Sequence, residues 1–266
     1  MPNVPAAGFD GPHDPDAVIW RYIDFAKLVS LLESQSLHLA RADVLDDRFE
    51  GSIPLELLIR REQPDSFWRS TTFSPANVPE LYRGMRGYVF VNCWCVSQWE
   101  SAALWPLYVP SHQGVAIRST YRRLVDALAA EEKPLHVGCV RYIDYTREGF
   151  PRRGDAASVE NMLTPFIHKR KSFEHERELR IIWFDREAAN VNMSNRRLGD
   201  ELPEEFMEGV RPGGVTARVD LAALIAEVRV SPPAPSWFKD VVDAVVKRYG
   251  FNFCTKQSDL GADPVY

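Results

Sequence analysis

Short apolar runs rich in aromatic and β-branched residues recur along the chain and are typical of β-strands. The first of them, residues 18–23, is followed by Asp24, a residue type that caps helices, and then by leucines at helical spacing. Residues 36–40 alternate between polar and apolar positions. The chain therefore begins with a predicted strand, a helix and a second strand.

The stretch from residue 88 to residue 120 holds three of the seven tryptophans and two of the nine tyrosines. It opens with one β-type run and closes with another, residues 115–117. Between them, Ser97 and Glu100 have the spacing of a capping box, which predicts a short helix that Pro106 limits. So many flat, partly polar side chains suit a pocket wall, and they suit a filled core at least as well.

The second half of the chain completes the predicted sheet. Residues 135–143 and 179–184 have the composition of strands. Residues 225–230, the apolar stripe over 238–249 and residues 251–254 form a β–α–β pattern. The predicted class is α/β or α+β, with a central mixed sheet flanked by helices.

Length and composition predict one domain rather than two. The chain has 266 residues, of which 45% are hydrophobic and 26% charged, as in an ordinary globular protein. Residues 1–16 are rich in proline and glycine and predict a flexible N-terminal arm. Residues 17–266 then form a single globular domain, with a polar insertion or loop around 185–214.

Charge and cysteine content narrow the classes of protein further. The net charge of −5 and the pI near 5.7 give no global basic field for nucleic acid. No apolar run approaches the roughly 20 residues of a membrane helix, and the N-terminus lacks the pattern of a secretory signal. Four cysteines in so long a chain do not form a disulfide framework. We therefore expect a cytoplasmic protein without a membrane partner.

The acidic pair Glu176 and Glu178 is the strongest candidate for chemistry. No spacing of histidines and cysteines predicts a metal site, and glycine-rich phosphate loops and nucleophile elbows are missing. Two carboxylates so close at the mouth of an apolar strand are costly unless cations or a substrate offset them. A solvated edge, in which Lys171, Arg177 and Arg180 screen the acids, explains the pattern equally well.

Three blocks in the chain resemble a bacterial family known only as domain of unknown function 2971. The first is Trp20-Arg21-Tyr22, followed by a helix and Leu37-x-Leu39; the second is residues 47–50. The third is Trp105-x-x-Tyr108 through Gly114, with residues 171–180 after it. The resemblance covers most of the chain, and this family implies no activity.

The order of motifs is also similar to that of ADP-ribosyltransferases: a strand bearing an arginine, an aromatic-rich middle, and Glu-x-Glu opening a strand. This resemblance implies an enzyme that uses NAD as substrate, with Arg21 gripping NAD, Glu178 as the catalytic acid and Glu176 as its partner. It further implies an ADP-ribosyltransferase-like fold and a role in defence or as a toxin. The aromatic candidates for the cofactor pocket are Tyr22, Trp99 and Tyr108.

Two other classes of function stay open at this point. A metal-dependent nuclease or phosphoesterase would gather carboxylate oxygens around Mg²⁺, with Lys171 nearby. Its candidate ligands are Asp47, Glu50, Glu100 and Glu178. A non-enzymatic module would instead hold a ligand or partner in the aromatic pocket without turnover. The sequence points to a small nucleotide ligand but names no protein or nucleic-acid acceptor.

Overall fold

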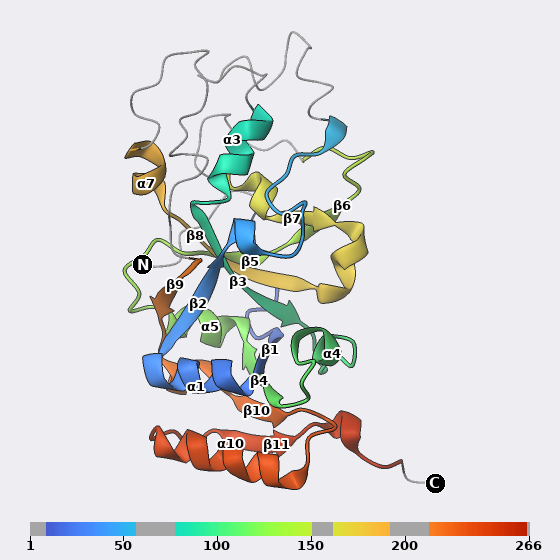
Figure 1. Ribbon diagram of the computed structural model, residues 1–266, viewed down its shortest axis with the longest axis vertical. Coiled ribbons are helices and arrows are strands. Elements are labelled where there is room, and N and C mark those ends of the chain that lie inside the picture. Colours follow the sequence, from blue (N-terminus) through green and yellow to red (C-terminus); the bar gives the residue numbers. More distant parts are fainter. Residues whose placement is uncertain (1–8, 57–77, 151–161, 192–212, 265–266) are drawn as a thin grey trace.

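A central mixed β-sheet with helices packed on it organises the computed structural model, which describes residues 9–56, 78–150, 162–191 and 213–264 (Figure 1). The fold is a single α/β domain, as predicted. The sheet contains β1 (Val18–Asp24), β2 (Ser36–Arg41), β3 (Val89–Val96), β4 (Gly114–Thr120), β5 (His136–Cys139), β8 (Glu178–Phe184), β9 (Gly214–Arg218), β10 (Glu227–Val230) and β11 (Cys254–Gln257). A separate parallel pair is formed by β6 (Arg141–Ile143) and β7 (His168–Arg170).

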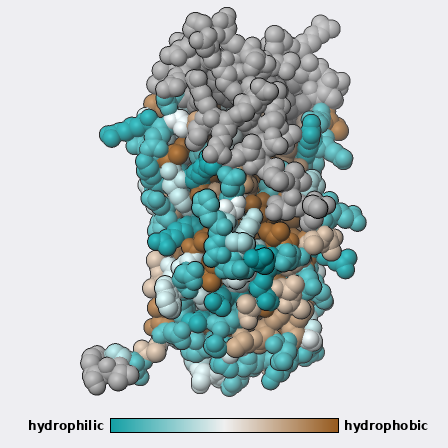
Figure 2. All heavy atoms as spheres, turned by 180° about the vertical axis from the view of Figure 1, so that it is seen from behind, coloured by the Kyte–Doolittle hydropathy of each residue, from teal (hydrophilic) through white to brown (hydrophobic). Residues whose placement is uncertain are grey.

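Helices cover both faces of this sheet. The α-helices are α1 (Phe25–Ser34), α3 (Val78–Met85), α4 (Leu104–Tyr108), α5 (Tyr121–Ala127), α7 (Arg186–Val191), α9 (Leu221–Leu224) and α10 (Ser236–Arg248). Short 3₁₀ turns are η1 (Ala42–Val44), η4 (Thr164–Phe166), η5 (Lys171–Glu176) and η6 (Asp259–Gly261). Seen from behind, the described surface is mostly hydrophilic, with hydrophobic side chains showing in the middle of the face (Figure 2).

The sheet divides at β3. One edge of β3 pairs with β8 from Val89 to Cys95. The other edge pairs with two strands in succession, with β2 at residues 90–91 and with β1 at residues 95–96. Residues 92–94 lie between these two pairings. Because β1 and β2 share one edge of β3 end to end, the sheet opens into a gap between them.

Two side chains bridge this gap. The guanidinium of Arg21 on β1 donates a hydrogen bond to the carbonyl of Cys93, at 2.6 Å. The amide of Asn92 donates to the carbonyl of His38 on β2, at 2.8 Å. These bonds satisfy backbone carbonyls around the opening with side chains in place of a neighbouring strand.

Helix α1 forms for the reasons that the sequence gives. The Asp24 carboxylate caps its first turn by accepting from the amide of Lys27, at 2.8 Å. Its leucines, Leu28, Leu31 and Leu32, are buried against the sheet, and each stabilises the fold by about 2 kcal/mol. The predicted strand–helix–strand opening of the chain is therefore confirmed.

Three apolar clusters fill the space around the sheet. The largest lies on the face covered by α1, α5, α9 and α10. Two smaller clusters lie elsewhere, one beneath α3 around Val89 and Ile182, the other beneath α4 around Trp20 and Ala116. Strand β3 contributes to all three through Phe90, its neighbour Val91 and Cys95.

The helix predicted to begin at Ser97 is wrong. The Ser97 hydroxyl donates to the carbonyl of Trp99 in a local turn, and α4 begins only at Leu104. Pro106 lies in the first turn of α4, where its missing N–H would have had no intrahelical partner. Glu100 is not a capping residue; it accepts from Trp105 Nε1 at 3.0 Å and pairs with Arg229.

The C-terminal β–α–β unit is confirmed, because β10 and β11 pair in parallel on either side of α10 in the chain. The last strand was expected over residues 251–254, but β11 begins only at Cys254 and ends at Gln257. Strand β9 begins at Gly214, where the predicted loop around 185–214 ends, and α7 lies at the start of that region. The sequence also predicts helices in residues 52–86 and 159–166, and both segments lie partly outside the described residues.

The predicted N-terminal arm reaches the described part of the chain at Phe9. Its side chain is buried in the cluster beneath α3, and the carbonyl of Asp10 accepts from the amide of Cys139, at 2.8 Å. Among the described residues, no helix has the length and apolar content to cross a membrane.

A glycine at the start of β4 tests the packing next to the gap. A Cβ at Gly114 would lie 2.4 Å from the backbone oxygen of Ile23, closer than real contacts allow. We expect Gly114→Ala to lower the free energy of unfolding by about 1–3 kcal/mol, measured by urea denaturation. Gly213→Ala is the matched control, since a Cβ there meets nothing within 4 Å. Equal unfolding midpoints for both variants would contradict the tight approach of β1 and β4.

Candidate active site

A cavity of about 510 Å³ opens at the gap between β1 and β2. Strands β1, β2 and β3 line it, together with α1, α4 and the start of β8. It holds five of the six residues that the sequence predicted for the site. These five are Arg21, Tyr22, Tyr108, Glu176 and Glu178.

Trp99 is the residue that the structure does not bring to the cavity. Its side chain is 81% exposed and does not line the wall. The nearby Tyr108 does line it, since α4 carries this tyrosine back towards the sheet. The aromatic part of the candidate site therefore comes from β1 and α4 rather than from the turn around Trp99.

Among the described residues, Arg21 is a cation without an acidic partner. Its guanidinium donates to the Cys93 carbonyl, and no described carboxylate lies within salt-bridge distance of it. Burial lowers the pKa of Arg21 from its usual value, yet an arginine stays protonated in proteins. A half-buried charge without a nearby counterion is costly, so this position favours an anionic ligand.

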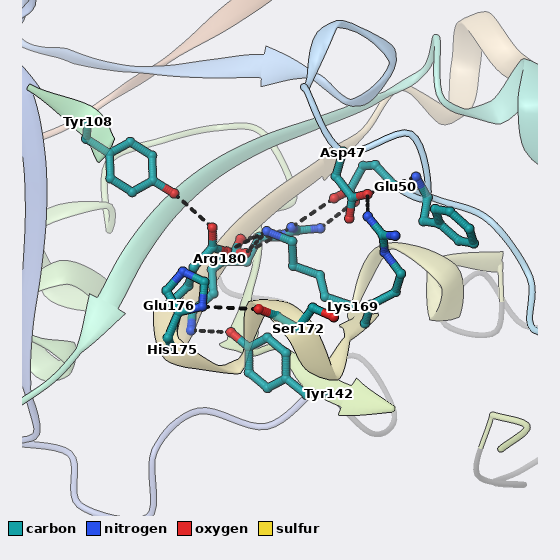
Figure 3. A network of polar contacts seen from close by, with 12 residues as sticks. Asp47, Glu50, Tyr108, Tyr142, Lys169, Ser172, His175, Glu176 and Arg180 are labelled. Atoms are coloured by element: carbon teal, nitrogen blue, oxygen red, sulfur yellow. Dashed lines mark hydrogen bonds and ion pairs between the residues drawn. The ribbon is translucent and has the colours of Figure 1, made fainter. Parts of the chain in front are cut away.

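Lys169 draws the two predicted acids together. Its ammonium donates to Glu176 at 2.6 Å and to Glu178 at 3.0 Å (Figure 3). The acids do not lie on an extended segment as predicted, because η5 ends at Glu176 and Arg177 adopts a left-handed conformation, φ 42°. That kink turns both carboxylates towards one cation. The Tyr108 hydroxyl donates to Glu176 as well, at 3.3 Å.

Glu178 is the more rigidly held of the two acids. Arg180 donates to both carboxylate oxygens of Glu178, at 2.5 and 3.1 Å, and the Glu178 side chain is 3% exposed. Burial would raise its pKa, but Arg180 and Lys169 outweigh burial and lower the pKa of Glu178 to about 2. Glu178 is therefore ionised at every pH at which the protein would be assayed.

Arg180 reaches a third carboxylate from a distant loop. Its side chain is 0% exposed, and it forms a two-pronged pair with Glu50 at 2.6 and 3.1 Å. It also donates to the carbonyl of Phe166, at 2.6 Å. Burial raises the pKa of Glu50, while Arg180 opposes that rise. The loop of residues 47–50 thus contributes a buried carboxyl group.

Of the three cations expected to screen the acidic pair, Arg180 binds Glu178, whereas Lys171 does not contact either acid. Lys171 bonds Glu148 at the surface, not the acidic pair. The cations that hold the acids are Lys169 and Arg180, and the sequence analysis did not assign Lys169 this role. The sequence did contain a signal for Arg180. It lies two residues after Glu178 in an otherwise apolar strand, so both side chains point to the same face, where a buried charge needs a partner of opposite charge.

The carboxylates proposed for a magnesium site do not assemble. Asp47 pairs with Arg170 at 2.8 Å, whereas Glu50 and Glu178 share Arg180. Glu100 belongs to the separate network of Arg229 already described. In the described parts of the chain, no group of three or more His, Cys, Asp or Glu side chains is arranged to hold a metal ion.

Comparisons with known proteins add little to this geometry. The sequence matches no family model, so membership of the domain-of-unknown-function family is not confirmed, and no curated protein matches it. Two solved structures of DarT from Thermus sp. 2.9, one with NAD+ and one with carba-NAD+, are weakly similar. Their identities are 14% and 11%, each with a TM-score of 0.34 over 92% of this chain and 97% of the other. A TM-score this low supports no conclusion about this protein.

The buried position of Arg180 predicts a large loss of stability on its removal. Arg180→Met leaves Glu50 without its counterion, which costs about 3–5 kcal/mol of unfolding free energy at neutral pH. Without Arg180, burial raises the pKa of Glu50 further, and protonation of Glu50 relieves the cost. The free energy of unfolding of Arg180→Met should therefore move back towards that of the wild type as the pH falls towards about 5. Urea denaturation at both pH values measures the effect.

An exposed arginine gives the control for this experiment. Arg122 pairs with Asp16 at the surface, at 2.8 Å, and Arg122→Met is expected to leave the unfolding midpoint nearly unchanged. Arg180→Met with a midpoint near that of the wild type, or with no gain at lower pH, would contradict the buried network.

Proposed function

We propose that the cavity between β1 and β2 binds NAD+ and that the protein is an NAD+-dependent ADP-ribosyltransferase-type enzyme. One observation carries the proposal: the half-buried guanidinium of Arg21, which has no carboxylate partner among the described residues, and the carboxylates of Glu176 and Glu178, far away in the sequence, line a single cavity. NAD+ carries both complementary groups, a diphosphate and a ribose that becomes cationic when nicotinamide leaves.

The cationic part of the cavity suits the diphosphate. Arg21 has no carboxylate partner, and a guanidinium offers several donors in a fork that matches phosphate oxygens. Its bond to the Cys93 carbonyl engages one donor atom and holds the fork in the gap. A bound diphosphate supplies the counterion that the described residues do not.

The acidic part suits the reacting ribose. When the bond between nicotinamide and ribose breaks, its electron pair leaves with nicotinamide and positive charge develops on the sugar. Carboxylates fixed before the reaction stabilise that charge without reorganising. An acceptor nucleophile or water then bonds to the same carbon and loses a proton. Glu178 and Glu176 supply the carboxylates, and Lys169 keeps both in one orientation.

Aromatic residues complete the cavity wall. The ring of Tyr22 packs edge-on against Trp105 with centroids 5.1 Å apart, and its hydroxyl accepts from the amide of Ser101. Burial raises the pKa of Tyr108, so its hydroxyl stays protonated and donates to Glu176. These two tyrosines offer ring surface to the flat nicotinamide. A role in defence or as a toxin remains a prediction from the resemblance.

Replacing an acid tests the proposed chemistry. Glu176→Gln keeps the size of the side chain but removes its charge, and we expect nicotinamide release from NAD+ to fall about 100-fold or more. Glu178→Gln should lower it at least as far, with circular dichroism checking that the fold survives. Assays contain purified protein, NAD+ and a cell lysate as the source of acceptor.

The exposed acid Glu132, outside the cavity, provides the matched control, and Glu132→Gln should release nicotinamide at the wild-type rate. Background release from wild type, together with no rise in its melting temperature on adding NAD+, would reject the proposal. Raised melting temperature without release would instead indicate a binding module.

A comparison of two exposed aromatic residues tests which of them belongs to the cavity. Tyr108 is 43% exposed but lines the cavity, whereas Trp99 is 81% exposed and does not. We expect Tyr108→Ala to raise the dissociation constant for NAD+ about tenfold while changing the unfolding midpoint little, because half of its ring is already in water. Trp99→Ala should change neither quantity. Isothermal titration calorimetry measures both variants, and equal losses of affinity would contradict the assignment.

A further inference from the structure

His38 on β2 lies in the same cavity as Arg21, on the other strand that borders the gap. We propose that His38 is a second anion-recognition residue, which with Arg21 binds the diphosphate of a nucleotide ligand across the division of the sheet. This inference rests on the proposed function and extends it to a residue that none of the sequence motifs marks.

The backbone places His38 at the edge of the opening. Its carbonyl accepts from the Asn92 amide at 2.8 Å, while the Cys93 carbonyl beside it accepts from Arg21 at 2.6 Å. Adjacent residues of β3 thus bind the two strands that carry Arg21 and His38. On β2 the flanking residues Leu37 and Leu39 are buried on the opposite face, so alternation directs His38 away from the main core.

Its imidazole is free to bind a ligand. Neither ring nitrogen has a hydrogen-bond partner among the described residues, and the side chain is exposed. The ring lies over Gly214 of β9, where a Cβ would come within 2.2 Å of Cε1 and 2.4 Å of Nε2. Only a glycine leaves room for the imidazole there. An exposed imidazole without a hydrogen-bond partner among the described residues is better suited to binding a ligand than to filling the core.

The charged groups that face His38 are Arg21 on β1 and Lys27 on α1. Burial first, and then these two cations, lower the pKa of His38 below its usual value. The free protein therefore carries a neutral imidazole at neutral pH. A bound diphosphate cancels the cationic field and favours the imidazolium, so ligand affinity rises as the pH falls.

The two residues then have different parts in recognition. Arg21 supplies a fixed charge, and Lys27 lies at the solvent side, 69% exposed and paired with Asp24. His38 supplies a charge that forms when an anion arrives. The phosphates, rather than the base or the nicotinamide, are the part of the ligand that this end of the cavity recognises.

Calorimetry with ADP-ribose tests the proposal, because its diphosphate diester keeps its charge over the pH range used. For wild type we expect binding about fivefold tighter at pH about 5.5 than at about 8, since a rise of one unit in the pKa of His38 on binding changes the affinity by at most tenfold. In His38→Gln, which keeps a hydrogen-bonding side chain but cannot become charged, affinity should be the same at both pH values. Adenosine, which lacks phosphate, should show no such pH dependence with either protein.

His13→Gln is the matched control, since His13 is exposed and lies outside the cavity. It should keep the wild-type pH dependence. The same dependence in His38→Gln, or no binding of ADP-ribose to wild type, would overturn the inference. Nicotinamide release from NAD+ reports the proposed function separately: His38-dependent binding without release leaves the anion site standing, and release without pH-dependent binding leaves only the enzyme.

Discussion

The candidate site depends on one fully buried cation, Arg180. It binds Glu178 and Glu50 at the same time, and so joins the start of β8 to a loop 130 residues earlier in the chain. Three charges leave water together here, which is tolerable only because each is paired and hydrogen-bonded. Fixing Glu178 in this way leaves Lys169 as the link to Glu176, the acid nearer the aromatic wall. The orientation of both carboxylates is thus set by packing before any ligand arrives.

The division of the sheet is the second constraint. Apolar clusters beneath α3 and α4 both reach β3, and the acidic network lies at the start of β8, which pairs with the same strand. Continuous pairing of β1 and β2 along β3 would have no room for Arg21 at the Cys93 carbonyl. Because the strands instead meet β3 at different ends, polar side chains enter the sheet without leaving backbone groups unbonded. A site buried this deeply in an apolar fold requires such an interruption.

Sequence patterns predicted the elements better than they predicted the contacts. The first strand, its capped helix and the C-terminal β–α–β unit follow from local rules of periodicity and capping. The prediction of a helix at Ser97 was wrong because the spacing of Ser97 and Glu100 does not reveal their partners. Glu100 instead binds the distant Arg229. For the site, the resemblance marked Arg21 and the acids, whereas Glu50 was named only as a candidate magnesium ligand and Lys169 was not assigned a role. The partner of Glu50 lies 130 residues away, which no short-range pattern encodes. Lys169 lies 7 and 9 residues before its two acids, and the kink at Arg177 that turns both acids towards it has no local signal.

The cations around the cavity differ in whether the chain neutralises them. Arg180 and Lys169 are neutralised by carboxylates of the chain itself, so they add rigidity and little net field to the cavity. Arg21 has no such counterion among the described residues, and therefore retains its electrostatic attraction for an anionic ligand where water screens it incompletely. Paired acids thus lie at one end of the cavity and a cation without a described carboxylate partner at the other. In the proposed reaction, a ligand with an anionic group and a centre that becomes cationic would be bound with each group at its complementary end, so the acids would stabilise the transition state more than the ground state.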